Sequence, residues 1–299
     1  MKSIGVLINP TSGKGKGALA GQKVLEALDQ SGQPYRNLTG GSLQQSRQNA
    51  QACIEGAELS ALLVVGGDGM VHLGANLCAA TDVPLGIIAA GTGNDSAMTM
   101  GLPLTDPAEA TRVALAALEA PVSIDLIAGK ASVGDFYAFG TVSAGFDALV
   151  NARANRMSWP KGQRRYEVAM VLELLKFKGI HYLAVIDGAE RKINAMLCAV
   201  ANAPSFGGGM LIAPHADLQD GKLDLFIVHK ITRATLLKIF PTVYTGKHVT
   251  HPAVEFVEAE SVVLDAGDMA VYADGEYVGQ SPVVTRVAKK ALLVLAPSR

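Results

Sequence analysis

The sequence predicts an α/β domain followed by a β-rich one: a doubly wound, nucleotide-binding domain at the N-terminus and a second domain built mostly of strands. Up to residue 127, short apolar runs alternate with helical stretches, which is the pattern of a parallel sheet with helices on both faces. Beyond that point, strand-like segments follow one another with few helices between them. We therefore place the first domain at residues 1–127, which a C-terminal strand within 291–299 could complete, and the second at residues 128–290.

Hydrophobic periodicity defines the elements expected in the first domain. Apolar runs that end in glycine-rich turns are expected to be strands, and the amphipathic stretches between them are expected to be helices. The expected strands are residues 4–8, 62–65, 85–89 and 122–127, and the expected helices are residues 18–30, 43–55, 71–79 and 107–119.

The second domain is expected to consist of short strands with two helices among them. Its apolar runs are rich in β-branched and aromatic residues and are bounded by turn residues. The expected strands are residues 136–143, 182–186, 196–201, 223–228, 254–257, 261–264 and 269–273, the expected helices are 164–176 and 233–244, and residues 291–295 are a strand that returns to either domain.

Composition limits the classes of function. With 299 residues, 49% of them hydrophobic, the chain can bury a large core. A formal net charge of -1 provides no overall attraction for nucleic acid, so we expect no nucleic-acid partner. Cys53, Cys78 and Cys198 form no CxxC pair, which argues against a disulfide framework and a zinc site and suits a reducing cytoplasm.

We expect no membrane anchor in this sequence. Its N-terminal apolar stretch is too short for a signal peptide, and no segment reaches the roughly 18 apolar residues of a membrane span. We expect a soluble cytoplasmic protein, at most peripheral to the inner face of a membrane.

The most informative motif is Gly66-Gly67-Asp68-Gly69, which directly follows an expected strand. Glycines allow positive φ angles and bring backbone N–H groups close to an anion, while Asp68 can hold the Mg²⁺ that neutralises phosphates. The motif therefore predicts a phosphate-binding turn.

A second glycine-rich turn, residues 9–17, contains three glycines and two lysines before an expected helix. Exposed N–H groups, the helix N-terminus and the lysine charges would all favour phosphate there. It lacks the Walker spacing, but Gly13, Gly15 and Ala18 satisfy G-x-G-x-x-A, with Arg36 and no carboxylate about 20 residues on, which would suit NADP better than NAD. An ordinary solvated loop is the alternative.

A third turn, Gly91-Thr92-Gly93-Asn94-Asp95, follows the expected strand at residues 85–89. Loops that leave the carboxyl ends of strands in a doubly wound sheet share one edge. The three turns should therefore line a common crevice, although each alone could be ordinary turn chemistry.

These motifs resemble, in order, those of the diacylglycerol kinase and sphingosine kinase catalytic-domain family. A GGDG turn alone is shared with NAD kinases and phosphofructokinases, but the GTGND turn together with the late Asp-Gly-Glu is more specific to lipid kinases. The matching residues fall within the segments 9–13, 66–69, 91–95, 101–103, 139–148, 161–166, 206–214, 220–224, 246–248 and 274–276, so that nearly the whole chain is covered.

The resemblance implies a two-domain fold with the active site in the cleft between the domains. The implied reaction transfers the γ-phosphoryl group of ATP, with Mg²⁺, to a lipid hydroxyl, with diacylglycerol giving phosphatidic acid as the first choice. Asp68 would organise the catalytic Mg²⁺ and Asp95 would support that site. The implied nucleotide-binding residues are Asn9, Pro10, Thr11, Ser12, Gly13, Thr39, Gly66, Gly67, Asp68, Gly69, Met70, Thr92, Asn94 and Asp95.

The family assigns its base to the Asp-Gly-Glu motif, so Asp274 and Glu276 are both candidates to deprotonate the lipid hydroxyl, with Asp125 as a relay partner. The two carboxylates sit two residues apart, which would place them on one side of an extended segment. A plain hairpin turn at Asp274-Gly275 is the alternative, because Asp-Gly is the favoured type I′ pair.

A second, structural Mg²⁺ is implied by resemblance to the bacterial soluble members of the family. Its ligands would be Asp220 with carbonyl groups near Asp217 and Lys222, which form a hard oxygen site. A loop held by ordinary turn chemistry is the alternative.

The sequence departs from the family pattern after the GGDG turn. The usual Thr and Glu are replaced by Met70 and Leu73, which removes a hydroxyl and a carboxylate near the expected phosphates. Activity and substrate are therefore less strongly implied than the fold. His215, His248 and His251 have no metal-ligand spacing, and His72 is expected to serve packing or capping.

One stretch concentrates basic and aromatic residues and could rest on anionic lipid headgroups. A solvated helix face is the alternative. The stretch contains Arg153, Arg156, Trp159, Lys161, Arg164, Arg165, Tyr166, Lys176 and Lys178.

Two other classes of function stay open at this point. A kinase related to NAD kinases, with a soluble acceptor, would explain the glycine turns equally well. An NADP-binding oxidoreductase or a nucleotide sensor would use the turn at residues 9–17 but would leave Asp274-Gly275-Glu276 without a role. The acceptor lipid and the oligomeric state are also open, a homodimer being one option.

Overall fold

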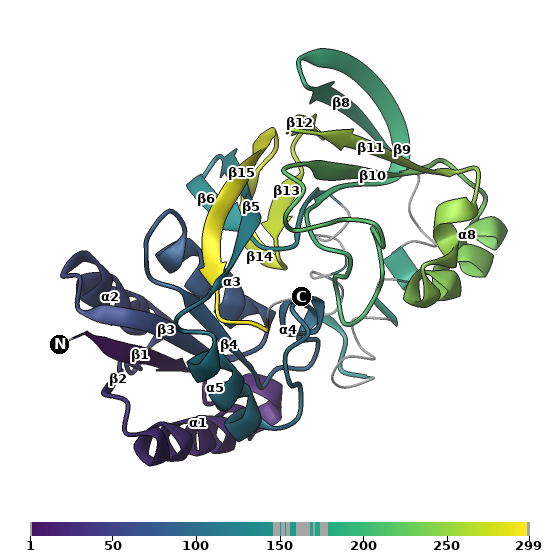
Figure 1. Ribbon diagram of the computed structural model, residues 1–299. Coiled ribbons are helices and arrows are strands. Elements are labelled where there is room, and N and C mark those ends of the chain that lie inside the picture. The colour runs from purple at the N-terminus through teal and green to yellow at the C-terminus, as the bar shows by residue number, and fades with distance from the viewer. Residues whose placement is uncertain are drawn as a thin grey trace. The chain divides into compact units, whose positions relative to one another are not determined.

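The structure, a computed structural model, describes residues 2–145, 150, 153, 156–159, 168–169, 171–173 and 179–297. The chain divides into two compact units. Unit 1 contains Met1–Asp125 and Lys289–Arg299, and unit 2 contains Leu126–Ala288 (Figure 1). Two long strands, β5 (Val122–Ala131) and β15 (Val283–Val294), carry the chain from one unit to the other.

Unit 1 is a parallel sheet with helices on both faces, as expected. Its strands lie in the order β2-β1-β3-β4-β15, and every neighbouring pair in this order is parallel. Helices α1 and α5 contact each other, as do α2 and α3. The elements are β1 (Ser3–Ile8), α1 (Ser12–Ser31), β2 (Tyr35–Asn37), α2 (Leu43–Glu55), β3 (Leu59–Gly66), α3 (Asp68–Cys78), β4 (Leu85–Ala89), α4 (Asp95–Thr99) and α5 (Pro107–Ala116).

The core of unit 1 follows from the two periodicities of the sequence. Val24 and Leu28 of α1 are one helical turn apart and fully buried, and they share a cluster with Val6, Leu63 and Ile88 of the strands. Each fully buried leucine or valine side chain contributes roughly 1.5–3 kcal/mol. This packing makes the sheet a rigid platform for the turns at the ends of β1, β3 and β4.

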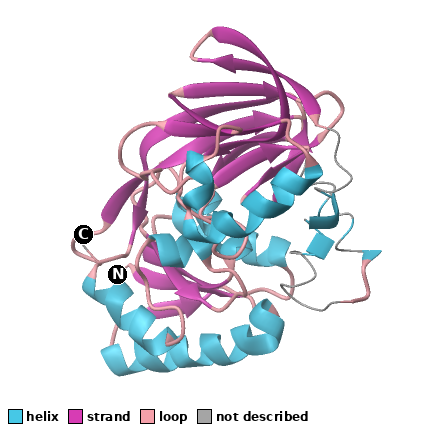
Figure 2. Cartoon of the chain, turned by 90° about the vertical axis from the view of Figure 1, so that its right-hand side faces the viewer, coloured by secondary structure: helices cyan, strands magenta, loops and turns pink. Residues whose placement is uncertain are grey.

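Unit 2 is a β-rich sandwich whose described strands pair antiparallel (Figure 2). The strand β9 pairs with β7, β8 and β10. Its elements are β6 (Gly134–Ala138), β7 (Thr141–Ala144), β8 (Ile180–Ile186), β9 (Ala189–Ala201), β10 (Leu223–His229), α8 (Arg233–Ile239), η1 (Phe240–Thr245), η2 (Lys247–Thr250), β11 (Val254–Ala259), β12 (Ser261–Asp265), β13 (Ala270–Ala273) and β14 (Glu276–Gln280).

The sheet formed by β9, β10 and β11 buries side chains on both of its faces. Alternate residues of β10 face opposite ways, so that Leu225 and Ile227 join the inner core of the sandwich. Phe226 joins a second cluster on the other face, together with Leu236 of α8. This second cluster contains the cavity described below.

Several expected elements have other bounds in the structure. The single strand expected at residues 136–143 is two strands, β6 and β7, separated by Phe139 and Gly140. The helix expected at 233–244 ends at Ile239 and continues as the 3₁₀ helix η1, because Pro241 lacks the N–H that an α-helix needs there. The helix expected from residue 18 begins at Ser12, with a break at Gly13–Gly15.

Other elements complete the comparison with the expectations. Strands β2 and β14 and helix α4 were not expected from periodicity. The expected strand at 291–295 is part of β15, whose Val294 pairs in parallel with Leu85 of β4. The expected helix at 164–176 lies mostly outside the described residues. Within the described part of the chain, no helix combines the length and apolarity that crossing a bilayer requires.

Candidate functional site

The three glycine-rich turns lie together at one edge of the unit 1 sheet. Ile8 pairs with Val65, and Gly66 pairs with Ala89, so that β1, β3 and β4 end at the same level. The backbone N–H of Ala90 donates to the carbonyl oxygen of Gly66 at 2.7 Å. The three turns that were expected to line a crevice thus lie side by side.

Close backbone contacts explain why these turns need glycine. A β-carbon placed on Gly91 would lie 2.4 Å from the Cα of Gly67, and one placed on Gly13 would lie 2.4 Å from the carbonyl oxygen of Ala90. Real β-carbons essentially never approach other atoms this closely, so a side chain at either position would push two turns apart.

We expect Gly91→Ala to lower the free energy of unfolding of the protein by about 1–3 kcal/mol, the usual cost of overpacking, and to weaken nucleotide binding. Thermal unfolding and titration with a non-hydrolysable ATP analogue measure the two effects. Gly41→Ala is the matched control, because its β-carbon would meet only the Gln45 side chain, at 3.5 Å. Equal behaviour of the two variants would contradict the close approach of the turns.

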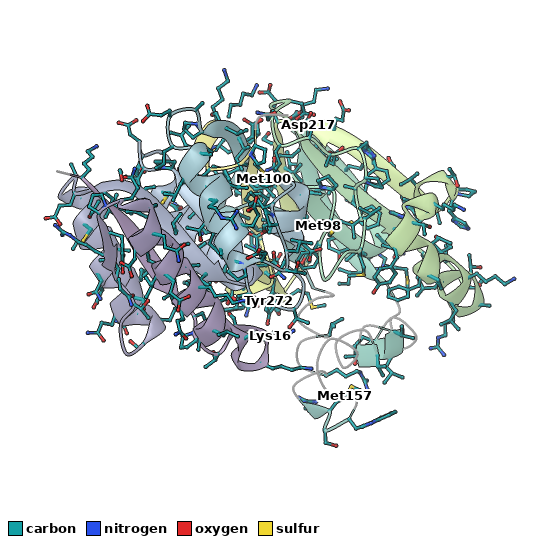
Figure 3. The ribbon with its side chains drawn as sticks, turned by 60° about the horizontal axis from the view of Figure 1, so that its bottom comes forward. Lys16, Met98, Met100, Met157, Asp217 and Tyr272 are labelled. Atoms are coloured by element: carbon teal, nitrogen blue, oxygen red, sulfur yellow. The ribbon has the colours of Figure 1, made fainter. Side chains whose placement is uncertain are left out.

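The first turn presents consecutive residues with left-handed backbone. Gly13, Lys14 and Gly15 have φ angles of 57°, 64° and 92°, so the chain turns sharply before α1 continues. Lys14 and Lys16 are exposed, and Figure 3 shows Lys16 at the N-terminal end of α1. Successive N–H groups in such a turn, followed by a helix N-terminus and two cations, fit a phosphate group.

Asp68 is the first residue of α3 and is held in place by the third turn. Its Oδ1 accepts hydrogen bonds from the backbone N–H of Ser96 at 3.0 Å and from the Ser96 hydroxyl at 3.1 Å. Both bonds use one oxygen, and the described residues donate no hydrogen bond to Oδ2. A fixed carboxylate with an available oxygen, beside turns that are predicted to bind phosphate, suits Mg²⁺. Ser96 was not expected from the sequence as the partner of Asp68.

Several of the predicted nucleotide-binding residues shape the turns. Asn9 Oδ1 accepts from the backbone N–H and the hydroxyl of Thr11, at 3.1 and 2.8 Å. Thr39 Oγ1 accepts from the N–H of Ile8 at 2.9 Å, and Asn94 Oδ1 accepts from the N–H of Gly91 at 2.9 Å. These bonds fix the backbone whose N–H groups would face the phosphates.

The other predicted nucleotide-binding residues differ in exposure. Thr92, Pro10 and Gly69 are exposed, whereas Asp95 is buried at the start of α4. Met70 is buried and lies against Gly66, where an added β-carbon would be 2.4 Å from its Cγ. The methionine that replaces the usual threonine therefore serves the packing of α3.

In unit 2, Asp274 and Gly275 form the two-residue turn between β13 and β14. Their φ angles are 50° and 86°, and Ala273 pairs with Glu276 across the turn. The backbone of Asp274-Gly275 is therefore the hairpin turn that was the alternative to a catalytic role. The Asp274 side chain has a further role, because its carboxylate accepts hydrogen bonds from another segment of unit 2.

Three backbone N–H groups donate to the Asp274 carboxylate. Those of Gly140 and Thr141 reach Oδ1 at 2.8 and 3.1 Å, and that of Phe139 reaches Oδ2 at 2.8 Å. On the same segment, Asn202 Nδ2 donates to the Phe139 carbonyl at 3.0 Å. Asp274 and Asn202 therefore clamp the junction between β6 and β7, while Glu276 is exposed at the start of β14.

Neither Asn202 nor the clamped junction was expected from the sequence. The pairs are separated by 63 to 135 residues, so no local pattern reveals them. The one available signal was the Asn202-Ala203-Pro204 sequence after an expected strand, since a polar residue at the end of a buried strand needs a partner.

Asp125, the expected relay partner, is 2% exposed, and its Oδ1 accepts from the N–H of Lys290 at 2.6 Å. Lys290 has a φ of 54°, so this bond stabilises an irregular point of β15. Asp125 lies in unit 1 and Asp274 in unit 2. A relay between them stays a prediction.

The residues of the expected second Mg²⁺ site form a loop with two hydrogen bonds, each between residues two apart in the sequence. Asp217 Oδ1 accepts from the N–H of Gln219, and Asp220 Oδ1 accepts from the N–H of Lys222 (Asp217 is labelled in Figure 3). The Lys222 ammonium pairs with Glu258. Among the described residues, no three His, Cys, Asp or Glu side chains gather to hold a metal. A site made of Asp220 and backbone carbonyls stays a prediction.

Asp224 lies near this loop as a buried carboxyl group. Burial raises its pKa, and His215 Nε2 lies 3.3 Å from its Oδ1 and lowers that pKa in part. No role for this pair was expected from the sequence.

The basic stretch expected at a membrane is described only in part. Arg153 pairs with Glu173, which uses its charge within the fold. Arg156 and Trp159 are exposed, Trp159 to 79%. Lys161, Arg164, Arg165, Tyr166, Lys176 and Lys178 lie outside the described residues, as do Phe146, Asp147 and Ala148 of the family motif.

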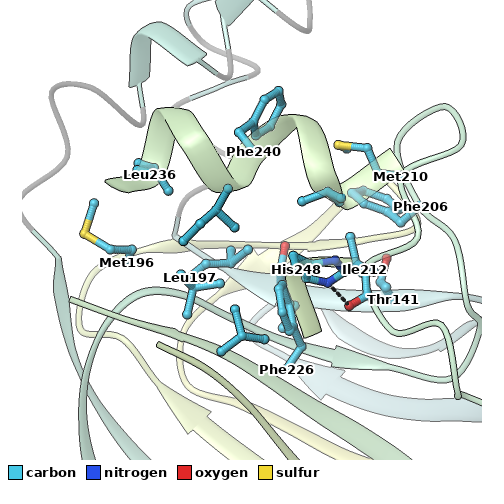
Figure 4. A pocket seen from close by; sticks show the side chains of 16 residues that line it. Thr141, Met196, Leu197, Phe206, Met210, Ile212, Phe226, Leu236, Phe240 and His248 are labelled. Atoms are coloured by element: carbon cyan, nitrogen blue, oxygen red, sulfur yellow. Dashed lines mark hydrogen bonds between the residues drawn. The ribbon is translucent and has the colours of Figure 1, made fainter. Parts of the chain in front are cut away.

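Unit 2 contains an apolar cavity of about 90 Å³ between the β9–β10 face and the segment α8–η1 (Figure 4). His248 lies in its wall, where Nε2 donates to the Ile212 carbonyl oxygen at 3.1 Å. Burial lowers the pKa of His248, so the wall carries no charge at neutral pH. The lining residues are Thr141, Ser143, Met196, Leu197, Ala199, Phe206, Met210, Ile212, Phe226, Val228, Leu236, Ile239, Phe240, Val243, His248 and Val254.

Comparison with known families gives two matches that together span most of the chain. Residues 3–127 match the family model described as the diacylglycerol kinase catalytic domain. Residues 140–296 match the one described as the YegS C-terminal NAD kinase beta sandwich-like domain.

Individual relatives agree with these matches. A diacylglycerol kinase of Mycobacterium tuberculosis is 37% identical over 294 residues, which cover 97% of this chain and 94% of the relative. A diacylglycerol kinase of Bacillus subtilis is 27% identical, with 94% and 92% covered. The crystal structure of a diacylglycerol kinase from Bacillus anthracis has the same fold, with a TM-score of 0.74 at 18% identity and 99% and 97% covered.

Proposed function

Because the chain belongs to the diacylglycerol kinase catalytic-domain family, we propose that it is an ATP-dependent lipid kinase whose acceptor is diacylglycerol. The product would be phosphatidic acid. The observation that carries the choice of a lipid acceptor is the apolar cavity of unit 2, whose size and lining suit a segment of an acyl chain.

Unit 1 would hold ATP at its three turns. Backbone N–H groups of the turns at Gly13 and Gly67, with the N-termini of α1 and α3, would bind the phosphate oxygens. Mg²⁺ would bind through Asp68 and neutralise charge on the phosphates. Lys14 and Lys16 add positive charge at the same turn. Phosphoryl transfer depends mainly on such positioning and charge neutralisation.

The Asp-Gly-Glu turn would supply the base. The lipid hydroxyl gives its proton to a carboxylate of Asp274 or Glu276 as its oxygen bonds to the γ-phosphorus, and the bond to the β-phosphate oxygen breaks to release ADP. Glu276 is exposed, whereas both Asp274 oxygens accept backbone N–H groups. Asp274 therefore also positions the Phe139–Gly140 junction, whichever carboxylate takes the proton.

The function is tested by incubating the protein with labelled ATP, Mg²⁺ and micelles that contain diacylglycerol, sphingosine or phosphatidylglycerol, with a further sample containing NAD and no lipid. Labelled phosphatidic acid supports the proposal. Label in NAD instead would establish a soluble acceptor, and nicotinamide binding without phosphoryl transfer would favour an oxidoreductase or sensor.

A cavity variant tests the acyl-chain site. We expect Val254→Phe, which fills part of the cavity, to raise KM for a long-chain diacylglycerol about tenfold, since each excluded CH₂ group costs about 0.8 kcal/mol. KM for a dioctanoyl acceptor should change less. Val257→Phe is the control, because this half-buried neighbour on β11 packs on the opposite core. Equal KM changes in both variants would exclude the cavity as the acyl site.

A further inference from the structure

The segment that covers the cavity, residues 230–250, has two chemically different sides. Four of its side chains line the cavity: Leu236 and Ile239 of α8, with Phe240 and Val243 of η1. Leu236 and Phe240 are labelled in Figure 4. Its outer side exposes Leu237 to 48% and Tyr244 to 38%. Exposed apolar side chains on a segment that covers an apolar cavity indicate an interaction surface.

The same segment is strongly basic. Lys230, Arg233, Lys238 and Lys247 are all exposed, and no Asp or Glu occurs between residues 230 and 254. The other 22 basic residues and all 27 acidic residues lie elsewhere, so the rest of the chain has a formal net charge of -5. In the described part of the chain, none of these four cations pairs with a carboxylate.

We propose that residues 230–250 are the surface by which unit 2 docks on an anionic lipid bilayer. Lys and Arg are attracted to the negative surface of such a bilayer, and leucine and tyrosine enter its interface. A soluble anion would account for the cations but not for the exposed Leu237 and Tyr244. A neutral apolar partner would leave the four cations without a role.

Docking at this segment would bring the bilayer close to the proposed acyl-chain cavity. This link between docking and the cavity rests on the proposed lipid-kinase function. A bilayer held against α8 and η1 would lie against the segment whose inner side chains line the cavity that we propose for the acyl chain. The segment expected from the sequence to meet a membrane, around Arg153, is a different one.

The test uses the full chain and vesicle flotation at 0.1 M salt, with vesicles of phosphatidylcholine alone or with phosphatidylglycerol added. We expect binding to the anionic vesicles to exceed binding to the neutral ones by at least tenfold and to fall at 0.5 M salt. The double variant Arg233→Glu with Lys238→Glu should lose at least tenfold in vesicle binding, since each basic residue contributes roughly fivefold.

Two further variants make the result specific. Lys23→Glu with Arg47→Glu makes the same charge change at exposed residues of unit 1 and should bind like the unaltered protein. Lys230→Glu with Lys247→Glu repeats the test at other points of the segment, should the first variant not fold. Thermal unfolding confirms that each variant is folded.

The outcomes separate this inference from the proposed function. Loss of vesicle binding with full activity on dispersed dioctanoylglycerol supports the docking surface. Unchanged vesicle binding in both segment variants, or an equal loss in the unit 1 variant, overturns it. Because flotation needs no catalysis, failure to phosphorylate any lipid would overturn the kinase proposal and leave the docking result intact.

Discussion

Asp68→Asn should lower kcat/KM for phosphoryl transfer by about 10²–10³, with little change in the free energy of unfolding. The asparagine oxygen can still accept both hydrogen bonds from Ser96, so the turn keeps its shape. The negative charge that would hold Mg²⁺ beside the phosphates is lost, and removal of one electrostatic group at a reacting centre has effects of this size. Initial rates with labelled ATP measure the loss.

The matched control is Ser96→Ala. It removes one of the two hydrogen bonds to Asp68 and keeps the charge and the backbone N–H bond. A loss of less than tenfold is expected there, because a neutral hydrogen bond contributes about 1 kcal/mol. If Asp68→Asn kept more than a tenth of the activity, or if Ser96→Ala lost as much, Asp68 would not be the metal-binding group.

The second large effect concerns stability. Asp274→Asn should lower the free energy of unfolding by about 3 kcal/mol, because it puts an NH₂ group where a carboxylate oxygen accepts a backbone N–H. Phe139 and Thr141 are 1% and 3% exposed, so water cannot replace the lost acceptor. Asparagine tolerates the φ of 50° at this position, so backbone strain does not contribute. Denaturant unfolding measures the change.

Glu276→Gln is the companion variant. Its side chain is exposed, so the free energy of unfolding should change by less than about 0.5 kcal/mol. A kcat reduced by about 10² or more at unchanged stability would assign the proton transfer to Glu276, and an unchanged kcat would assign it to Asp274. Equal stability of Asp274→Asn and the unaltered protein would refute the clamp on the Phe139–Gly140 junction.

Local periodicity was sufficient for most elements of unit 1. The strand Leu85–Ala89 and the helix Leu43–Glu55 have the expected bounds, because each places its apolar residues at a single regular period. The expected bounds were wrong where local sequence signals conflict. Phe139-Gly140 interrupts an apolar run without any turn residue pair, and Pro241 changes the type of helix without ending the amphipathic pattern.

The membership of the family was also accessible from the sequence, since it rests on short motifs in a fixed order. The roles of single residues were less accessible. Asp274 was an expected base, and its bonds to residues 139–141 add a positioning task that spans 133 to 135 residues of chain. Ser96, which holds Asp68, has no motif of its own.

The sequence by itself determined the two kinds of layer, the three glycine turns and the carboxylates that we propose for catalysis, because periodicity, turn chemistry and short motifs act over a few residues. The tertiary structure alone decided which oxygen of Asp68 is engaged, which backbone segment Asp274 holds, and that α8 and η1 enclose an apolar cavity. These features depend on hydrogen bonds and packing between residues far apart in the chain, whose partners are set only when the sheets form.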